Sequence, residues 1–230
     1  MDAPTGTGRD GVWTVVVAAG GGTRFGAPKQ YASLAGRRVI DWSLDAARTC
    51  SEGIVLVVAS DQVKRPEPGA DEVRPGGRTR SESVRAGLDA IPLGAAVVVV
   101  HDGARPAAGP QLFAAVVAAV RNGADAAVPG VELVDSVRRR DGGAIDRAEL
   151  VAVQTPQAFR ADALRAAHAQ GDDATDDATL VERAGGRVVV VAGDPDNVKL
   201  THPADLERLA RHLQTVAGRP VEADAPARGR

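Results

Sequence analysis

VWTVVVAAGGGTRFGAPKQY, residues 12–31, is the stretch of the sequence that decides the fold. Its first six residues form a valine-rich apolar run without polar alternation, which is typical of a parallel strand buried on both faces. Gly20-Gly21-Gly22 follows almost at once and predicts a turn whose backbone N–H groups can face an anion. A strand that ends in such a loop favours an open α/β sheet that binds its ligand at this edge.

The rest of the chain continues this pattern, because short apolar runs alternate with helical patterns. Buried strands are predicted at Val12–Val17, Ile54–Ala59, Ala96–Val100, Ala124–Val128 and Val188–Val191. Helices are predicted at Val39–Thr49, Ser81–Ile91, Gln111–Arg121, Ala161–Ala169, Asp177–Ala184 and Pro203–Leu213. The repeated strand–helix order predicts an α/β protein with a doubly wound, mainly parallel sheet.

Composition limits the classes of function. The chain has 230 residues, of which 44% are hydrophobic, and a formal net charge of -2. It can therefore bury a sizeable core, and it has no global charge for binding nucleic acid or an anionic membrane. Cys50 is the single cysteine, which excludes an internal disulfide and a cysteine metal site. The four histidines show no ligand spacing, which argues against a zinc site.

The two ends of the chain carry no strong signal. The start is polar, and no apolar run approaches the roughly 18 residues of a membrane span, so we expect a cytoplasmic protein with no membrane segment. Residues 1–216 are predicted to form a single domain. Residues 217–230 are rich in proline, glycine and alanine and are predicted to form a disordered tail.

Residues 131–153 break the strand–helix rhythm. Val131–Arg140 and Ala144–Val153 are strand-like and flank Asp141-Gly142-Gly143, which contains two hairpin turn signals. This charged segment has too little apolar content to bury itself, so it projects into solvent or grips another subunit. We interpret residues 131–153 as a protruding β-hairpin arm that forms a dimer.

The glycine loop fits neither common phosphate-loop pattern. Counted from Gly20, the third glycine of the dinucleotide fingerprint G-x-G-x-x-G falls on Phe25. Gly21 and Gly26 have the Walker A spacing, but Ala27-Pro28 stands where that pattern needs Lys-Ser or Lys-Thr. These mismatches argue against a dehydrogenase and a P-loop ATPase.

Two cations of the same loop suit a phosphate ligand. Arg24 offers a forked donor and Lys29 a point charge, and Pro28 stiffens the backbone just before Lys29. The alternative interpretation is a tight glycine turn with two solvated cations.

A second feature is the strand that ends in His101-Asp102-Gly103-Ala104-Arg105-Pro106. Ligands of open α/β sheets gather at the carboxyl ends of strands. Asp102 there can organise Mg²⁺ through water or bind a ribose hydroxyl, and Arg105 can pair with a phosphate. The alternative is that Asp102 caps a turn and Arg105 is its ion-pair partner.

A third feature is Gly76-Gly77-Arg78-Thr79-Arg80-Ser81-Glu82-Ser83-Val84, a glycine turn that runs into a helix. The N–H groups at a helix start favour anions or carbonyl oxygens. The alternative is that Thr79 or Ser81 is simply the helix N-cap. Further polar groups, each ordinary surface when taken singly, are Arg147, Thr155-Pro156-Gln157, Asp176-Asp177 and Asn197-Val198-Lys199.

Together these stretches are more specific than any one of them. AAGGGTRFGAPKQY, GGRTRSESV, HDGARP, TPQ, TDDATLVE and DPDNVKLTHPADL follow one another in this order. The chain thereby resembles the 2-C-methyl-D-erythritol 4-phosphate cytidylyltransferases of the non-mevalonate isoprenoid pathway, over roughly Val12 to Leu213. The resemblance implies a Rossmann-like nucleotidyltransferase fold and an enzyme that joins CTP to the polyol phosphate and releases pyrophosphate. It also implies Mg²⁺, held mainly by the CTP phosphates.

The resemblance implies roles for particular residues. Arg24 and Lys29 would stabilise the triphosphate and the transition state, and Lys199 would contact the α-phosphate. The CTP site would comprise backbone contacts and base- or ribose-binding groups at Ala18, Ala19, Gly20, Gly22, Gly77, Ser83 and Asp102, with Asp102 also a water-mediated metal contact. The methylerythritol phosphate would be held by Arg105, Ser136, Arg147 and Thr155, of which Ser136 and Arg147 come from the arm of a partner subunit in a homodimer.

Three rival functions stay open. A ribitol 5-phosphate cytidylyltransferase would use the same chemistry on a different polyol phosphate. A nucleotidyltransferase that uses UTP or GTP on a hexose phosphate is a second rival. A nucleotide-binding regulatory module without catalysis is a rival of another class, against which the retention of both Lys29 and Lys199 argues.

Overall fold

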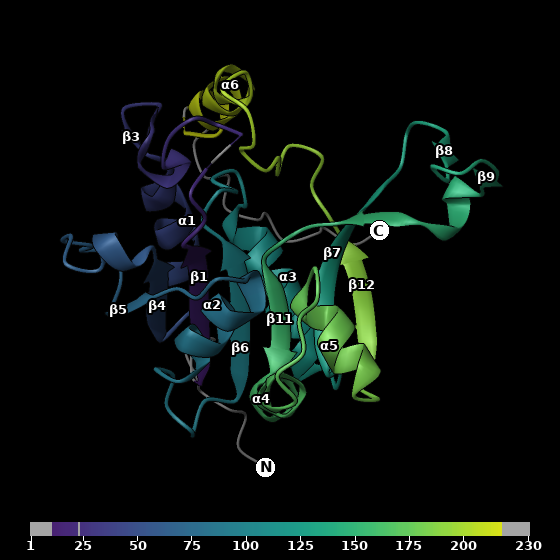
Figure 1. The fold of residues 1–230 in the computed structure, drawn as a ribbon, viewed down its shortest axis with the longest axis horizontal. Helices are drawn as coiled ribbons and strands as arrows, with labels where there is room; N and C mark the ends of the chain where they lie inside the picture. The colour runs from purple at the N-terminus through teal and green to yellow at the C-terminus, as the bar shows by residue number, and fades with distance from the viewer. Residues whose placement is uncertain (1–10, 23, 218–230) are drawn as a thin grey trace, which may run out of the picture.

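The computed structural model describes residues 11–22 and 24–217, and it consists of one large sheet with helices on both faces (Figure 1). The eight strands of the sheet are β1 (Val12–Ala18), β4 (Gly53–Val58), β5 (Glu72–Pro75), β6 (Val97–Asp102), β7 (Ala126–Glu132), β10 (Val151–Val153), β11 (Gln157–Arg160) and β12 (Val188–Ala192). Of the predicted tail, residues 217–230, only residue 217 is described, and residues 218–230 lie outside the described part of the chain.

The strand order follows from the pairing. β5, β4, β1 and β6 are neighbours and all run parallel, and β12 pairs in parallel with β7. β11 lies between β6 and β7 and is antiparallel to both. β10 pairs antiparallel with the far end of β7. The predicted mainly parallel, doubly wound sheet is therefore confirmed, with an antiparallel insertion that the sequence patterns did not predict.

Alternate residues of β1 serve two different cores, which explains why the strand is apolar apart from Thr14. Val16 belongs to a core with α1 (Val39–Arg48) and α3 (Pro110–Arg121). Val15 belongs to a core on the other face with α2 (Arg80–Leu88), α4 (Ala161–Ala169) and α5 (Asp177–Arg183). A strand covered on both faces favours apolar side chains throughout, and the hydroxyl of buried Thr14 pairs with Ser51 Oγ at 2.6 Å.

A third, smaller core lies above the carboxyl edge of the sheet. The last helix, α6 (Asp205–Ala217), packs Leu209 and Leu213 against Leu34, Val39 and Leu200. Phe25 and Val198 pack against the same cluster. α6 thus ties the glycine loop to the segment that carries Lys199 (Figure 1).

The arm is present, but its strands are shorter than predicted. β8 (Val137–Arg138) and β9 (Ala144–Ile145) form the hairpin, and Gly142 and Gly143 at its turn have φ of 109° and 80°. The prediction of one strand over Ala144–Val153 was wrong, because a 3-10 turn at Arg147–Glu149 separates β9 from β10. The charged sequence offers no second sheet face to pack on, so only two residues of each arm strand pair.

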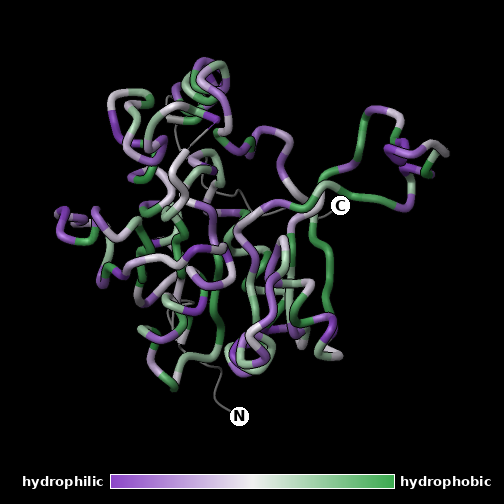
Figure 2. Tube along the Cα trace, viewed as in Figure 1, coloured by the Kyte–Doolittle hydropathy of each residue, from purple (hydrophilic) through white to green (hydrophobic). Residues whose placement is uncertain are grey.

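The arm stands clear of the rest of the chain, and hydrophilic residues predominate at its tip (Figure 2). Val134, Val151 and Val153 along its stem are 84%, 41% and 40% exposed. A single copy of the chain therefore leaves apolar surface uncovered here. Within residues 11–22 and 24–217, no helix is both long enough and apolar enough to cross a membrane.

Candidate active site

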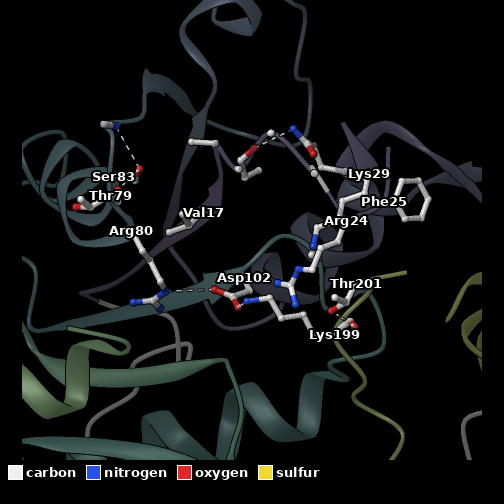
Figure 3. A pocket seen from close by; sticks show the side chains of 18 of the residues that line it. Val17, Arg24, Phe25, Lys29, Thr79, Arg80, Ser83, Asp102, Lys199 and Thr201 are labelled. Carbon is white, nitrogen blue, oxygen red and sulfur yellow. Dashed lines mark hydrogen bonds and ion pairs between the residues drawn. The ribbon is translucent and has the colours of Figure 1, made fainter. Parts of the chain in front are cut away.

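A cavity of about 430 Å³ opens at the carboxyl ends of the central strands (Figure 3). Its walls come from the end of β1, the glycine loop, the start of α2, the end of β6 and the segment after β12. Every residue predicted for the nucleotide or the catalytic group lines it: Ala18, Ala19, Gly20, Gly22, Arg24, Lys29, Gly77, Ser83, Asp102 and Lys199. The cavity therefore lies at the edge of the sheet where α/β proteins bind their ligands.

The glycine loop turns at Gly22. This residue has φ +64°, and a Cβ atom there would lie 2.1 Å from the Ala27 carbonyl oxygen. The Gly22 carbonyl accepts from the N–H groups of Phe25 and Gly26 at 2.8 and 2.9 Å. Only glycine fits this close turn, which brings Arg24 back to the cavity.

Lys29 is held by its neighbours in the sequence and in space. The adjacent Gln30 is buried, and its Nε2 donates to the carbonyl oxygen of Ala18 at 3.0 Å, which anchors the loop to the end of β1. The Lys29 ammonium donates to the Leu200 carbonyl at 2.6 Å. Partial burial lowers the pKa of Lys29 below its ordinary value, and the positive charges of Lys199 and Arg24 lower it further.

Asp102 lies between two cations at the end of β6 (Figure 3). Its Oδ2 accepts from the Lys199 ammonium at 2.6 Å, and its Oδ1 lies 3.6 Å from Nε of Arg80. Burial by itself would raise the pKa of Asp102, but the charges of Lys199 and Arg80 hold it well below the ordinary value. Asp102 is therefore ionised at neutral pH.

The alternative pairing of Asp102 with Arg105 is wrong. Arg105 instead donates through Nη1 to the Asn197 carbonyl at 2.7 Å. Burial lowers the pKa of Arg105, opposed by the charge of Asp102. Nε of Arg105 is buried without a hydrogen-bond partner, and the residue lines the second cavity described below.

The glycine turn at residues 76–79, which we call the base loop because it carries the predicted CTP-binding residue Gly77, is built as one unit with the start of α2. Ser83 Oγ accepts from the Gly77 N–H at 3.2 Å and donates to the Thr79 carbonyl at 3.0 Å. Thr79 is the N-cap, and its side chain accepts from the N–H of Glu82. The cap predicted as an alternative is therefore present, and it shapes the cavity wall.

A second cavity of about 310 Å³ shares Arg80, Asp102 and Lys199 with the first. Arg105 and Thr155, both predicted for the polyol phosphate, line it, and so do Gln154 and Gln157. Gln157 is 1% exposed, and its Oε1 has no hydrogen-bond partner. An unpaired buried acceptor beside a cavity is suited to a hydroxyl-bearing ligand.

Thr155 also supports Asp102 from behind. Its Oγ1 accepts from the backbone N–H of Asp102 at 3.0 Å and shares a hydrogen bond of 3.2 Å with His101 Nδ1. His101 is fully buried, and this burial lowers its pKa to about 4. The imidazole is therefore neutral and serves the packing under the site.

The two predicted arm residues do not reach either cavity of their own chain. Ser136 is exposed, and Arg147 donates to the carbonyl oxygen of Val134 within the arm. The structure therefore brings together Arg105 and Thr155 of the predicted polyol phosphate group, but not Ser136 and Arg147.

With this geometry in view, residues 12–214 match the family described as IspD, 2-C-methyl-D-erythritol 4-phosphate cytidylyltransferase. The chain belongs to this family. It is 41% identical over 89% of its length to the 2-C-methyl-D-erythritol 4-phosphate cytidylyltransferase of Cereibacter sphaeroides, of which it covers 97%. The enzyme of that name from Thermus thermophilus has a crystal structure with TM-score 0.75 and 35% identity, covering 86% of this chain and 98% of that one.

The chain also matches longer family members. It is 40% identical over 86% of its length to the Bifunctional enzyme IspD/IspF of Hyphomonas neptunium, of which it spans 55%. The family predicted from the sequence, the nucleotidyltransferase class and the fold are therefore confirmed.

Sequence reasoning missed Arg80, which lines both cavities. It lies in the quoted GGRTRSESV stretch, and the signal was its place as the first residue of a helix beside a glycine turn. Gln154 was missed as well. Its Nε2 donates to the Asp194 carbonyl at 2.8 Å, and its Oε1 accepts from Asn197 Nδ2 at 3.3 Å, which fixes the segment before Lys199.

Proposed function

We propose that the first cavity holds CTP and the second holds 2-C-methyl-D-erythritol 4-phosphate, so that their phosphates meet at Arg80, Asp102 and Lys199. The observation that carries this assignment is the sharing of these three side chains by the two cavities. Substrates placed in this way bring the attacking phosphate next to the α-phosphorus, and such positioning contributes a large part of the barrier reduction in a two-substrate reaction.

The charge of the first cavity suits a triphosphate. Among its described lining residues, a single carboxylate, Asp102, stands against five cationic side chains: Arg24, Lys29, Arg78, Arg80 and Lys199. A nucleoside triphosphate carries a high negative charge, which grows on the departing pyrophosphate as the reaction proceeds. Preorganised cations that face this developing charge stabilise the transition state more than the ground state.

The reaction is a substitution at phosphorus. A phosphate oxygen of the polyol phosphate forms a bond to the α-phosphorus of CTP, and the bond from that phosphorus to the oxygen bridging to the β-phosphate breaks. The electron pair of the broken bond leaves with pyrophosphate. Because the attacking group is already an anion, the step needs positioning and charge stabilisation and no general base.

Lys29 is placed to serve the phosphates while it stays anchored. One of its three N–H donors is used by the Leu200 carbonyl, which leaves two for phosphate oxygens. The negative charge of a bound triphosphate opposes the lowering of the Lys29 pKa and keeps the ammonium protonated. Arg24 and Lys199 line the same cavity and face the same phosphates.

The other lining residues select the substrates. The backbone of Ala18, Ala19, Gly20 and Gly22 contacts CTP, and Gly77 and Ser83 read the cytosine. Because a Cβ atom on Gly77 would lie 2.3 Å from Glu82 Cβ, this loop has no room for a side chain. Arg105 and Thr155 contact the polyol phosphate in the second cavity.

Mg²⁺ fits this site as a companion of the CTP phosphates. Residues 11–22 and 24–217 contain no group of three or more His, Cys, Asp or Glu that could hold a metal ion. Asp102 is the carboxylate available to contact the ion, directly or through water. Mg²⁺ commonly binds through one or two carboxylates together with substrate phosphates. When bound, it neutralises phosphate charge and orients the triphosphate.

The arm supplies the remaining substrate contacts in a homodimer. Neither Ser136 nor Arg147 lines a cavity of its own chain, and the arm stem exposes Val134 at 84%. A partner that covers this stem would bring the arm tip over the neighbouring second cavity. The expected cytoplasmic location stays a prediction.

The decisive experiment measures pyrophosphate release from CTP and Mg²⁺ with either methylerythritol phosphate or ribitol 5-phosphate. We expect release with the first and at least about tenfold lower kcat/KM with the second. Faster release with ribitol 5-phosphate would reassign the substrate, and CTP binding without release with either would favour a regulatory module. Light scattering tests the dimer, and a fully active monomer would contradict the role given to Arg147.

A further inference from the structure

A chain of charged and polar side chains runs from the buried interior to the point where the two cavities meet. Its members, in spatial order, are His168, Asp177, Arg80, Asp102 and Lys199. They come from α4, α5, α2, the end of β6 and the segment after β12. Arg80, Asp102 and Lys199 line the cavities, whereas His168 and Asp177 line neither.

Asp177 is the inner anchor of this chain. Its side chain is 0% exposed, and both of its carboxylate oxygens are bonded. Oδ2 accepts from Arg80 Nη1 at 2.6 Å, and Oδ1 accepts from His168 Nε2 at 3.0 Å. Asp176, its neighbour, caps α5 by accepting from the N–H of Thr179, so the helix start does not require Asp177 for capping.

Arg80 is fixed by this anchor. Burial by itself would lower its pKa, but the carboxylates of Asp177 and Asp102 outweigh burial and raise it. The planar guanidinium is therefore always charged, and its orientation follows from which donors are occupied. With Nη1 bonded to Asp177, Nε faces Asp102, and Asp102 in turn holds Lys199.

We propose that Asp177 is a positioning residue: it holds Arg80 in the orientation that sets Asp102 and Lys199 between the two substrates. The inference rests on the proposed function, because it is measured by the reaction of that site. A buried ion pair adds little net stability compared with apolar packing, since the loss of hydration offsets the attraction. The pair of Asp177 with Arg80 therefore matters to the site through the orientation that it gives to the Arg80 guanidinium.

The main test is Asp177→Asn, which keeps the size of the side chain and removes its charge. We expect kcat/KM to fall ~10- to 100-fold, because small displacements of reacting groups have effects of this size. The matched control is Asp162→Asn. Asp162 pairs with Arg160 at 2.6 Å and has a 70% exposed side chain, so kcat/KM should stay within about twofold of the wild-type value. An Asp177→Asn enzyme that is folded and within about twofold of wild type overturns the proposal.

A double-mutant cycle separates positioning from a general structural effect. In an Arg80→Met background the guanidinium is absent, so adding Asp177→Asn should lower kcat/KM by less than about threefold further. An equal loss in both backgrounds would show that Asp177 does not act through Arg80. An inactive wild-type enzyme would instead count against the proposed function, so the two failures are distinguishable.

If Asp177→Asn does not fold, the other partner of Asp177 provides the test. His168→Gln keeps an N–H donor, whereas His168→Leu removes it and leaves Oδ1 of Asp177 unpaired. Because the orphaned carboxylate shifts, we expect kcat/KM about fivefold lower for the leucine variant than for the glutamine variant. Equal kcat/KM in the two folded variants overturns the proposal.

Discussion

Replacing Lys29 by methionine removes the ammonium and keeps an unbranched side chain that is one atom shorter. A unit charge about 4 Å from a phosphate oxygen interacts with it by about 4 kcal/mol at an effective dielectric constant of about 20. Part of this interaction already exists in the ground state, so about 3 kcal/mol of selective transition-state stabilisation is at stake. Because about 1.36 kcal/mol corresponds to a factor of ten in rate, we expect kcat to fall by roughly two orders of magnitude.

The fold should survive this substitution. The lost hydrogen bond to Leu200 is worth about 1 kcal/mol, and the loss is partly offset because a partly buried charge is removed as well. The assay is pyrophosphate release at saturating substrates, with a thermal melt of each variant. Lys64→Met is the matched control, because Lys64 lines neither cavity. A folded Lys29→Met enzyme with kcat within about threefold of wild type would refute the role of Lys29.

Three further variants test other parts of the site. Arg147→Ala should raise KM for the polyol phosphate about tenfold and KM for CTP much less, because a charge-assisted contact to one substrate is lost. Gly76→Ala should raise KM for CTP, because the added Cβ lies 2.3 Å from Ala19 Cβ and displaces the base loop. His101→Phe should make the free energy of unfolding less sensitive to acid. Burial lowers the pKa of His101 to about 4, so this imidazole binds a proton less tightly in the folded chain than in the unfolded chain. The free energy of unfolding therefore falls as the pH falls, by about 2 kcal/mol between about pH 7.5 and 5.

A different result for any of these three variants would contradict the role given to that residue. Equal rises of both KM values would remove Arg147 from the polyol phosphate pocket. An unchanged KM for CTP in Gly76→Ala would place the nucleotide elsewhere. Urea unfolding at the two pH values decides the third case: if His101→Phe shows the same pH dependence as wild type, His101 is not the group responsible.

The strands and helices could be predicted wherever one pattern dominated the local sequence. The run Val97–Val100 and the helix that starts at Asp177 are examples, because burial on both faces and an N-cap both leave local marks. β11 could not be predicted in this way. Its four residues, Gln157–Arg160, are too few for a period, and its antiparallel place between β6 and β7 is decided by partners distant in the sequence.

The candidate site shows the same difference between features with a local sequence pattern and features decided by distant residues. Lys29 and Asp102 could be predicted because each belongs to a quoted motif at a strand end. The ion pair from Asp102 to Lys199 and the link from Arg80 to Asp177 span 97 residues each, and no local pattern reports such contacts. The alternative that paired Asp102 with Arg105 favoured the neighbour in the sequence, whereas the neighbour in space is Lys199.

The antiparallel strand β11, which the sequence patterns did not predict, also determines how the boundary between the two cavities is built. The segment entering β11 lies beside the end of β6, where Thr155 holds the backbone of Asp102 through its hydroxyl. The carbonyl oxygen of the same Thr155 accepts from Asn197 Nδ2 at 2.9 Å, two residues before Lys199. One residue thus fixes both strand-end segments whose side chains form the 2.6 Å pair between the two cavities. A parallel strand at this position would have its amino end at the opposite edge of the sheet, so the antiparallel direction of β11 is what allows the two cavities to share one charged boundary.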